Sequence, residues 1–186
     1  MPFDLDSYRC HSPPATLWKV KHWNSQFKRD ELSGDLVAAD PTREITTKLR
    51  LSFAAQDHFK WENRRPTCFQ STFSCYNHAR NWGNGVRWIE IYEIDTTNLS
   101  DGVYIFDAKE LASRMRIPYK HGENEFIFLH RIPGSAIRST ERNAPAEHVS
   151  RVGTTKRIVF VDSDESTEPA SVDDITSGMR AVALGE

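Results

Sequence analysis

One stretch of the chain joins a turn, two carboxylates and a strongly apolar segment: His121-Gly122-Glu123-Asn124-Glu125-Phe126-Ile127-Phe128-Leu129. The apolar residues predict a buried strand, and the glycine predicts a turn in front of it. In an extended chain, residues i and i+2 point to the same face. We therefore expect Glu123 and Glu125 to project side by side where a loop enters a sheet.

This carboxylate pair has two interpretations. Two like charges held close together disfavour joint ionisation, and they suit a site that meets a developing positive charge. Glutamate is also common at exposed strand ends, and for the pair alone a solvated position is the commoner outcome. The pair alone does not distinguish a chemical role from an exposed surface position, so the evidence has to come from other segments of the chain.

Composition limits the class of protein. The 186 residues are enough for one domain with a core and a tail. The formal net charge of −2 gives no general attraction to nucleic acid or membranes. No apolar run reaches the length of a membrane span, and residues 1–16 lack the apolar core of a secretory signal. Three cysteines without paired spacing favour reduced thiols, so we expect a cytoplasmic protein.

Metal binding is not expected. The seven histidines and three cysteines show no ligand spacing such as H-x-x-x-H or C-x-x-C.

Hydrophobic periodicity predicts an α+β domain with short strands over residues 16–142. We expect strands at residues 17–20, 67–72, 86–94, 103–107 and 126–132, and helices at 42–58, 75–82 and 108–115. The first helix is placed by the apolar spacing of Ile45, Leu49, Phe53 and Ala54, with Asp40-Pro41 at its start.

The two ends of the chain differ from this central part. Residues 1–15 are expected to form a flexible leader. Residues 143–186 form an extension in which one further strand, at 157–161, is compatible with the sequence. Residues 162–176 are rich in Asp, Glu, Ser and Thr, which is typical of a disordered tail.

Three segments then line up in chain order. Lys19 lies on an early strand, Leu17-Trp18-Lys19-Val20, and Ser71-Thr72 lies on the strand Phe69-Gln70-Ser71-Thr72-Phe73-Ser74. The third segment is Glu123-Asn124-Glu125, followed by an apolar run that ends at Ile132-Pro133. This order resembles the Arg–Ser–Glu pattern of mono-ADP-ribosyltransferases of the cholera-toxin-like type, over roughly residues 17–137. The chain also resembles an uncharacterised group of fungal proteins.

The resemblance implies a split mixed β-sheet core with short flanking helices, and NAD as a substrate. It implies transfer of ADP-ribose to an acceptor protein, with residual hydrolysis of NAD by water. The Glu-x-Glu form resembles family members that modify arginine. Glu125 would stabilise the oxocarbenium-like state formed when the nicotinamide–ribose bond breaks. Glu123 would position or deprotonate the acceptor, Ser71 would orient Glu125, Thr72 would brace the strand at the NAD site, and Lys19 would meet the pyrophosphate.

Two departures from the family pattern favour a second interpretation. Lys19 stands where the family has Arg, and lysine lacks the bidentate fork that holds phosphate and ribose together. Phe73 replaces the third residue of Ser-Thr-Ser, although Ser74 follows at once. The alternative is therefore a catalytically degenerate module that binds a protein partner. Modification of nucleic acid is disfavoured by the acidic charge balance.

Two further features stay open at this level. Arg64 and Arg65 can supply a phosphate contact or form an exposed basic connector before Pro66, which is the commoner outcome. Tyr119 lies where the family often presents an aromatic residue to its target protein, and it equally fits a tyrosine at the edge of the core. The acceptor is not revealed by the sequence.

Overall fold

In the computed structural model, the described residues are 2–60, 65–82, 88–120 and 122–143. The helices are α1 (Lys48–Phe59), α2 (Tyr76–Trp82) and α3 (Ala108–Met115), with 3-10 turns at Asp6–Tyr8 and Gly134–Ala136. The strands are β1 (Thr16–His22), β2 (Lys28–Arg29), β3 (Leu36–Val37), β4 (Phe69–Phe73), β5 (Ile89–Asp95), β6 (Ile105–Asp107), β7 (Glu125–Leu129), β8 (Arg131–Ile132) and β9 (Ile137–Asn143). The predicted strand at 157–161 and the acidic tail lie outside the described residues.

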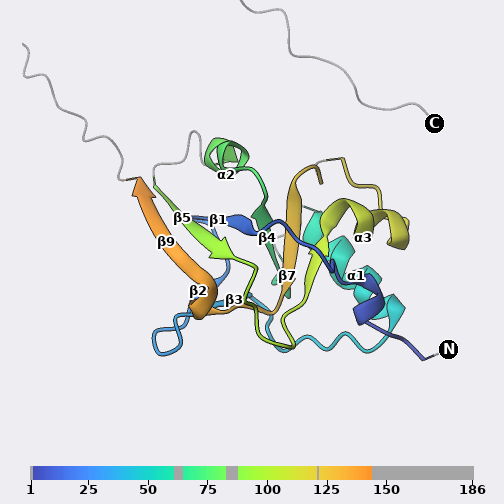
Figure 1. Ribbon diagram of the computed structural model, residues 1–186. Coiled ribbons are helices and arrows are strands. Elements are labelled where there is room, and N and C mark those ends of the chain that lie inside the picture. The colour runs from blue at the N-terminus through green and yellow to red at the C-terminus, as the bar shows by residue number, and fades with distance from the viewer. Residues whose placement is uncertain (1, 61–64, 83–87, 121, 144–186) are drawn as a thin grey trace, which may run out of the picture. The chain divides into compact units, whose positions relative to one another are not determined.

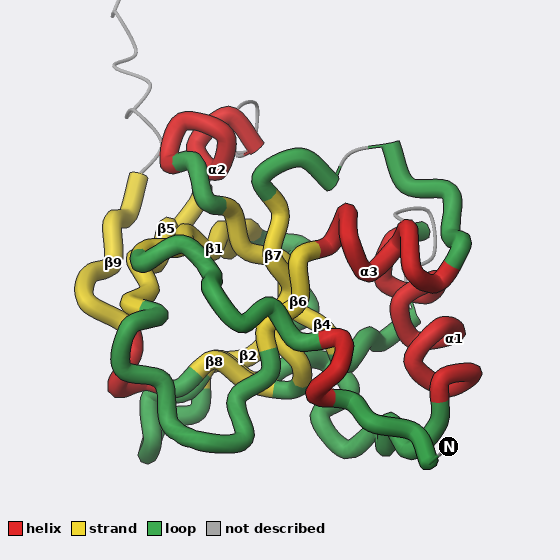
Figure 2. The backbone as a smooth tube through the Cα atoms, turned by 45° about the vertical axis from the view of Figure 1, so that its right-hand side comes forward, coloured by secondary structure: helices red, strands yellow, loops and turns green. Residues whose placement is uncertain are grey.

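The main sheet has six strands in the order β6-β7-β4-β1-β5-β9, and a second sheet has the order β2-β3-β8 (Figures 1 and 2). Every described strand pair is antiparallel. The α+β class predicted from the sequence is confirmed, but the expectation of a mixed sheet is wrong. Most neighbours in the main sheet are not consecutive in the chain, but the connections bring each strand in with its direction opposite to that of its neighbours.

Helices α1 and α3 pack against one face of the main sheet (Figure 1). Phe69 of β4 and Ile127 and Leu129 of β7 meet Leu51 of α1 and Leu111 of α3 in this cluster. Successive strand residues face opposite sides of a sheet, so Phe128 points the other way. Phe128 packs in a second cluster with residues of β3 and β8. The main sheet is therefore covered on both faces.

The predicted strands and short helices were largely found. Helix α3 has the bounds predicted for it, and β1, β4, β5 and β6 fall within or beside the predicted runs. Residues 86 and 87, the first of the predicted fifth-strand run, lie outside the described residues. These strands are short runs rich in apolar and β-branched residues and bounded by turn signals, a pattern that predicts strands buried along most of their length.

The first helix was placed wrongly at its start and on its buried face. Helix α1 begins after Thr47, whose side chain accepts a hydrogen bond from the Arg50 amide, and residues 42–47 are not helical. Leu49 and Phe53 are exposed, whereas Leu51, Ala54, Ala55 and Phe59 are buried. Asp40-Pro41 imitates a helix start, but the hydroxyl that satisfies a free amide of the first turn belongs to Thr47.

The predicted strand over 126–132 is two strands. His130 has a φ of 63°, which interrupts the extended backbone between β7 and β8. This break sends the chain from the main sheet to the second sheet, where Ile132 pairs with Leu36.

Candidate functional site

The strands that carry the three candidate motifs are neighbours, in the order β7-β4-β1. Lys19 lies in the middle of β1, Ser71 lies in the middle of β4, and Glu125 is the first residue of β7. Residue pairing places Phe73 opposite Glu125 and Ser71 opposite Ile127. Ser71 and Glu125 therefore share one face of the sheet, and their side chains are hydrogen-bonded.

The main sheet opens between β1 and β4. These two strands share a single pair of opposed residues, Trp18 and Phe73, whereas β1 and β5 share seven. Beyond this pair, the Lys19 ammonium group donates a hydrogen bond to the Ser71 carbonyl oxygen at 2.9 Å. The side chain of Lys19 thus bridges the gap that backbone hydrogen bonds do not close.

Lys19 is only 7% exposed. Its ammonium nitrogen lies 4.5 Å from the centre of the Phe27 ring, which is within range of a cation–π contact. Burial lowers the pKa of Lys19 to about 7, and the negative charge of Glu125 opposes this shift. The structure thus uses the first-strand cation to join two strands as well as to place charge beside Glu125.

Glu125 is 2% exposed and is held by two hydroxyl groups. The Tyr119 hydroxyl donates a hydrogen bond to its carboxylate, and the Ser71 hydroxyl makes the second bond. Burial raises the pKa of Glu125, while these hydroxyls and the charge of Lys19 act in the opposite direction. The carboxylate is therefore contacted by hydroxyl groups of two residues, Tyr119 and Ser71.

Glu123 does not lie on the strand. It is part of a turn in which Asn124 has a φ of 64°, so the expectation of an extended segment with two adjacent carboxylates is wrong. The rule that places i and i+2 on one face applies only to extended backbone. The Glu123 side chain is 80% exposed and lies 3.7 Å from the Lys109 ammonium group. The two glutamates therefore have different environments, one in solvent and one buried.

Thr72 and Ser74 support the backbone near the site. The Thr72 hydroxyl donates to the Phe126 carbonyl oxygen at 2.8 Å, and Thr72 is fully buried, which fits a bracing role and offers no surface to a ligand. The Ser74 amide donates to the Asn124 carbonyl oxygen at 2.9 Å. Ser74 thus contacts the turn before Glu125, while the buried Phe73 fills the position expected for the third serine.

Sequence reasoning missed His58, which comes from α1. Its Nε2 lies 3.0 Å from the Ser71 hydroxyl, and its Nδ1 lies 3.1 Å from the Thr67 hydroxyl. Burial, with a smaller effect of Lys19, lowers the pKa of His58 to about 3, so the ring is neutral at pH 7. For Ser71 to donate to Glu125, His58 must donate from Nε2 and accept at Nδ1 from Thr67. In this arrangement Thr67 donates to His58, His58 donates to Ser71, and Ser71 donates to the Glu125 carboxylate.

Tyr119 is partly buried and packs against the hydrophobic cluster that α1 and α3 form with the main sheet. Its ring stacks on Phe59 with centroids 4.2 Å apart. A Cβ atom at Gly122 would lie 2.7 Å from this ring, so only glycine leaves room for it. The interpretation as a tyrosine at the edge of the core is confirmed, and its hydroxyl adds a contact to Glu125 that the sequence did not indicate.

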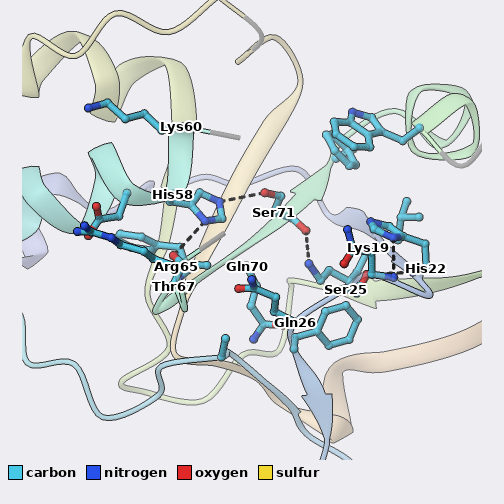
Figure 3. Close-up of a pocket in the computed structure, with 18 residues that line it drawn as sticks. Lys19, His22, Ser25, Gln26, His58, Lys60, Arg65, Thr67, Gln70 and Ser71 are labelled. Carbon is cyan, nitrogen blue, oxygen red and sulfur yellow. Dashed lines mark hydrogen bonds between the residues drawn. The ribbon is translucent and has the colours of Figure 1, made fainter. Parts of the chain in front are cut away.

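A pocket of about 340 Å³ adjoins these residues. Lys19, His58 and Ser71 are part of its wall, and Figure 3 shows Ser71 between the other two. Arg65, one of the two arginines considered as phosphate contacts, also lines it, whereas Arg64 lies outside the described residues. The pocket is in the lower part of the size range of small-molecule sites.

A family model for a domain of unknown function (DUF7587) matches residues 12–145. The chain belongs to this family. The matched DUF7587 region contains all the strands described here and every candidate site residue. No curated protein matches the chain.

Two general properties complete the description of this DUF7587 chain. None of the described helices is long and apolar enough to cross a membrane. In the part of the chain that the structure describes, no cluster of His, Cys, Asp or Glu side chains could hold a metal ion.

Proposed function

We propose that this chain is an NAD-dependent mono-ADP-ribosyltransferase that transfers ADP-ribose to a protein side chain, with arginine as the favoured acceptor. One observation carries the proposal: Lys19, Ser71 and Glu125 lie on three adjacent strands, and Lys19 and Ser71 line a pocket next to the buried Glu125. Residues more than fifty positions apart in the sequence are thereby brought together in the order that the resemblance requires. Hydrolysis of NAD by water is the side reaction.

Glu125 supplies the electrostatic part of the reaction. Cleavage of the bond between nicotinamide and ribose develops positive charge on the ribose, and a fixed carboxylate stabilises that charge most strongly where water is excluded. Ser71 and Tyr119 keep the Glu125 carboxylate oriented, and His58 fixes the direction of the Ser71 hydroxyl. Because the Tyr119 hydroxyl is bonded to the Glu125 carboxylate, it has to move away when the ribose of the substrate binds there.

Glu123 acts on the acceptor. A group that positions or deprotonates an incoming side chain needs reach before it needs a shifted pKa. The solvent-exposed position of Glu123, at the turn in front of Glu125, provides that reach.

Release of nicotinamide from NAD tests the role of Glu125. We expect Glu125→Gln to lower the rate at least about a hundredfold, which is the usual cost of losing a transition-state electrostatic contact. Glu110→Gln, an exposed glutamate of α3 paired with Arg114, is the matched control and should leave the rate unchanged. Equal rates for the wild type and Glu125→Gln, or no rate for either, would remove the enzymatic claim.

A second variant separates hydrolysis from transfer. We expect Glu123→Gln to keep NAD hydrolysis and to lose ADP-ribosylation of an arginine-containing acceptor peptide. Loss of hydrolysis in Glu123→Gln to the same extent as in Glu125→Gln would contradict the separate role assigned to the exposed glutamate.

The alternative function is a catalytically degenerate module that binds a protein partner. It is favoured by the contacts of Lys19 and Glu125 within the domain. The Lys19 ammonium group is bonded to a backbone carbonyl oxygen, and the Glu125 carboxylate is bonded to the Tyr119 hydroxyl, so both groups already have partners that NAD would have to replace. Following heat stability during titration with NAD distinguishes the two, since a ligand that binds the native state raises the melting temperature. The degenerate module predicts no shift at millimolar NAD.

A further inference from the structure

The pocket beside Ser71 has a positive wall in a protein of negative net charge. Among the described residues, three lysine and arginine side chains line it, Lys19, Lys60 and Arg65, against one carboxylate, that of Asp57. This carboxylate is neutralised from outside the pocket by Arg43 at 3.0 Å. The formal charge of the whole chain is −2, so the positive potential is a local property of this pocket.

Lys60 and Arg65 differ from Lys19 because, within the described part of the chain, their charged groups are free to bind a ligand anion. Lys19 is buried and its ammonium group is bonded to the Ser71 carbonyl oxygen. Lys60 and Arg65 are exposed, and neither has an ion-pair partner among the described residues. In Figure 3 both lie on the His58 side of the pocket, opposite Lys19 and His22. The available charge is therefore at the end of the pocket formed by the end of α1 and the segment before β4.

The remaining wall is suited to a ligand with rings and polar edges. Phe27, Phe69, Phe73 and Trp82 all line the pocket. Gln70 lines it too, and its amide nitrogen donates to the Leu36 and His130 carbonyl oxygens. The side-chain amide oxygen of Gln70, Oε1, is buried and has no hydrogen-bond partner within the described part of the chain. A buried acceptor of this kind is stabilised when a ligand N–H or O–H group reaches it.

We infer that Lys60 and Arg65 form the phosphate-binding end of the pocket, and that they, rather than Lys19 of β1, hold the diphosphate of a nucleotide. With respect to NAD, the inference rests on the proposed function. Lys19 then serves to bridge β1 and β4, and the phosphate contacts come from a different part of the chain. The cations, the aromatic wall and the orphan acceptor together fit a phosphorylated nucleoside better than a simple anion.

Titration of the purified full chain with ADP-ribose tests this assignment, because ADP-ribose keeps the diphosphate and lacks the bond that the proposed reaction breaks. We expect Lys60→Ala combined with Arg65→Ala to weaken binding at least about tenfold, as for the loss of charge-assisted hydrogen bonds. The matched control is Lys48→Ala combined with Arg50→Ala. It removes the same charge from the first turn of α1, away from the pocket, and the one ion pair that it breaks among the described residues is the exposed pair of Arg50 with Glu44.

Nicotinamide riboside, which has no phosphate, provides the second measurement. Its affinity should be the same in the wild type and the pocket variant. An unchanged ADP-ribose affinity in the pocket variant, an equal loss in the control variant, or no binding of ADP-ribose by the wild type at millimolar concentration would each overturn the assignment. Inorganic pyrophosphate is titrated into the wild type, the pocket variant and the control variant as well. Equal binding to all three would show that Lys60 and Arg65 make no specific phosphate site, with an adventitious ion only, and would also overturn the assignment.

The same variants separate this assignment from the proposed function. If ADP-ribose binding depends on Lys60 and Arg65 but NAD is never cleaved, the phosphate site stands and the transferase fails. If NAD is cleaved with a KM that the pocket variant does not change, the transferase stands and the phosphate site fails.

Discussion

Lys19 occupies an environment in which a lysine is neutral at moderately alkaline pH. In the unfolded chain its pKa is near 10.5, whereas burial lowers the pKa to about 7 in the folded protein. Between these two values the unfolded state binds more protons than the native state. Stability therefore increases as the pH rises from about 7 toward 10.5.

Lys19→Met removes this dependence. We expect the free energy of unfolding of the wild type, relative to Lys19→Met, to rise between pH 7 and pH 10. Urea unfolding of both proteins at several pH values measures the difference, and other groups that titrate in this range cancel in the comparison. Parallel curves for the two proteins would show that Lys19 keeps an ordinary pKa in the folded state.

The residues of the site differ in how much of their role the sequence could reveal. Lys19, Ser71 and Glu125 were chosen as candidates because their order along the chain resembles a family pattern. The contact of His58 with Ser71 joins α1 to β4 and depends on the angle at which the helix packs, which no spacing in the sequence encodes. Glu123 was misplaced because the left-handed backbone of Asn124 turns the chain before the strand begins.

At the level of secondary structure, the start of α1 depends on one side chain. The Thr47 hydroxyl accepts a hydrogen bond from the Arg50 amide at 3.1 Å and so satisfies one of the free amides of the first turn. We expect Thr47→Ala to lower the free energy of unfolding by about 1 kcal/mol, as for other residues at this helix position. Thr46→Ala, at the preceding exposed residue, should change it by less than about 0.5 kcal/mol. Chemical denaturation of the three proteins decides, and equal losses in both variants would contradict a capping role.

The elements that sequence reasoning did not find are those with little hydrophobic pattern. β2 and β3 contain two residues each, too few for an alternation to be recognised, and β8, equally short, was found only as the end of the predicted strand at 126–132. β9, Ile137-Arg138-Ser139-Thr140-Glu141-Arg142-Asn143, is largely polar and lies at the edge of the main sheet. It is held by pairing with β5 and by contacts such as that of Ser139 with Glu93, so its position follows from its neighbours.

For the whole molecule, three hydrophobic clusters form the core of the described residues, and all of them belong to the compact unit Met1–His148. The remaining segment is polar and acidic over residues 162–176. We expect a chain that ends at Val161, and so keeps the candidate strand at 157–161, to retain its melting temperature within about 3 °C, since a segment of such polar and acidic composition buries little apolar surface. Differential scanning calorimetry of both lengths measures this, and a larger loss would show that the extension contributes to the fold.

The single residue pair between β1 and β4 has a mechanical consequence. Strands β6-β7-β4 and strands β1-β5-β9 are each joined by several backbone pairs, but the two halves meet at Trp18 and Phe73 and at the Lys19 amine. Two hydrophobic clusters also contain residues of both halves, so side-chain packing joins the halves where the backbone pairing is sparse. A molecule that fills the gap adds the cross-link that the backbone lacks, so binding there would stiffen the whole domain and not only the residues it touches.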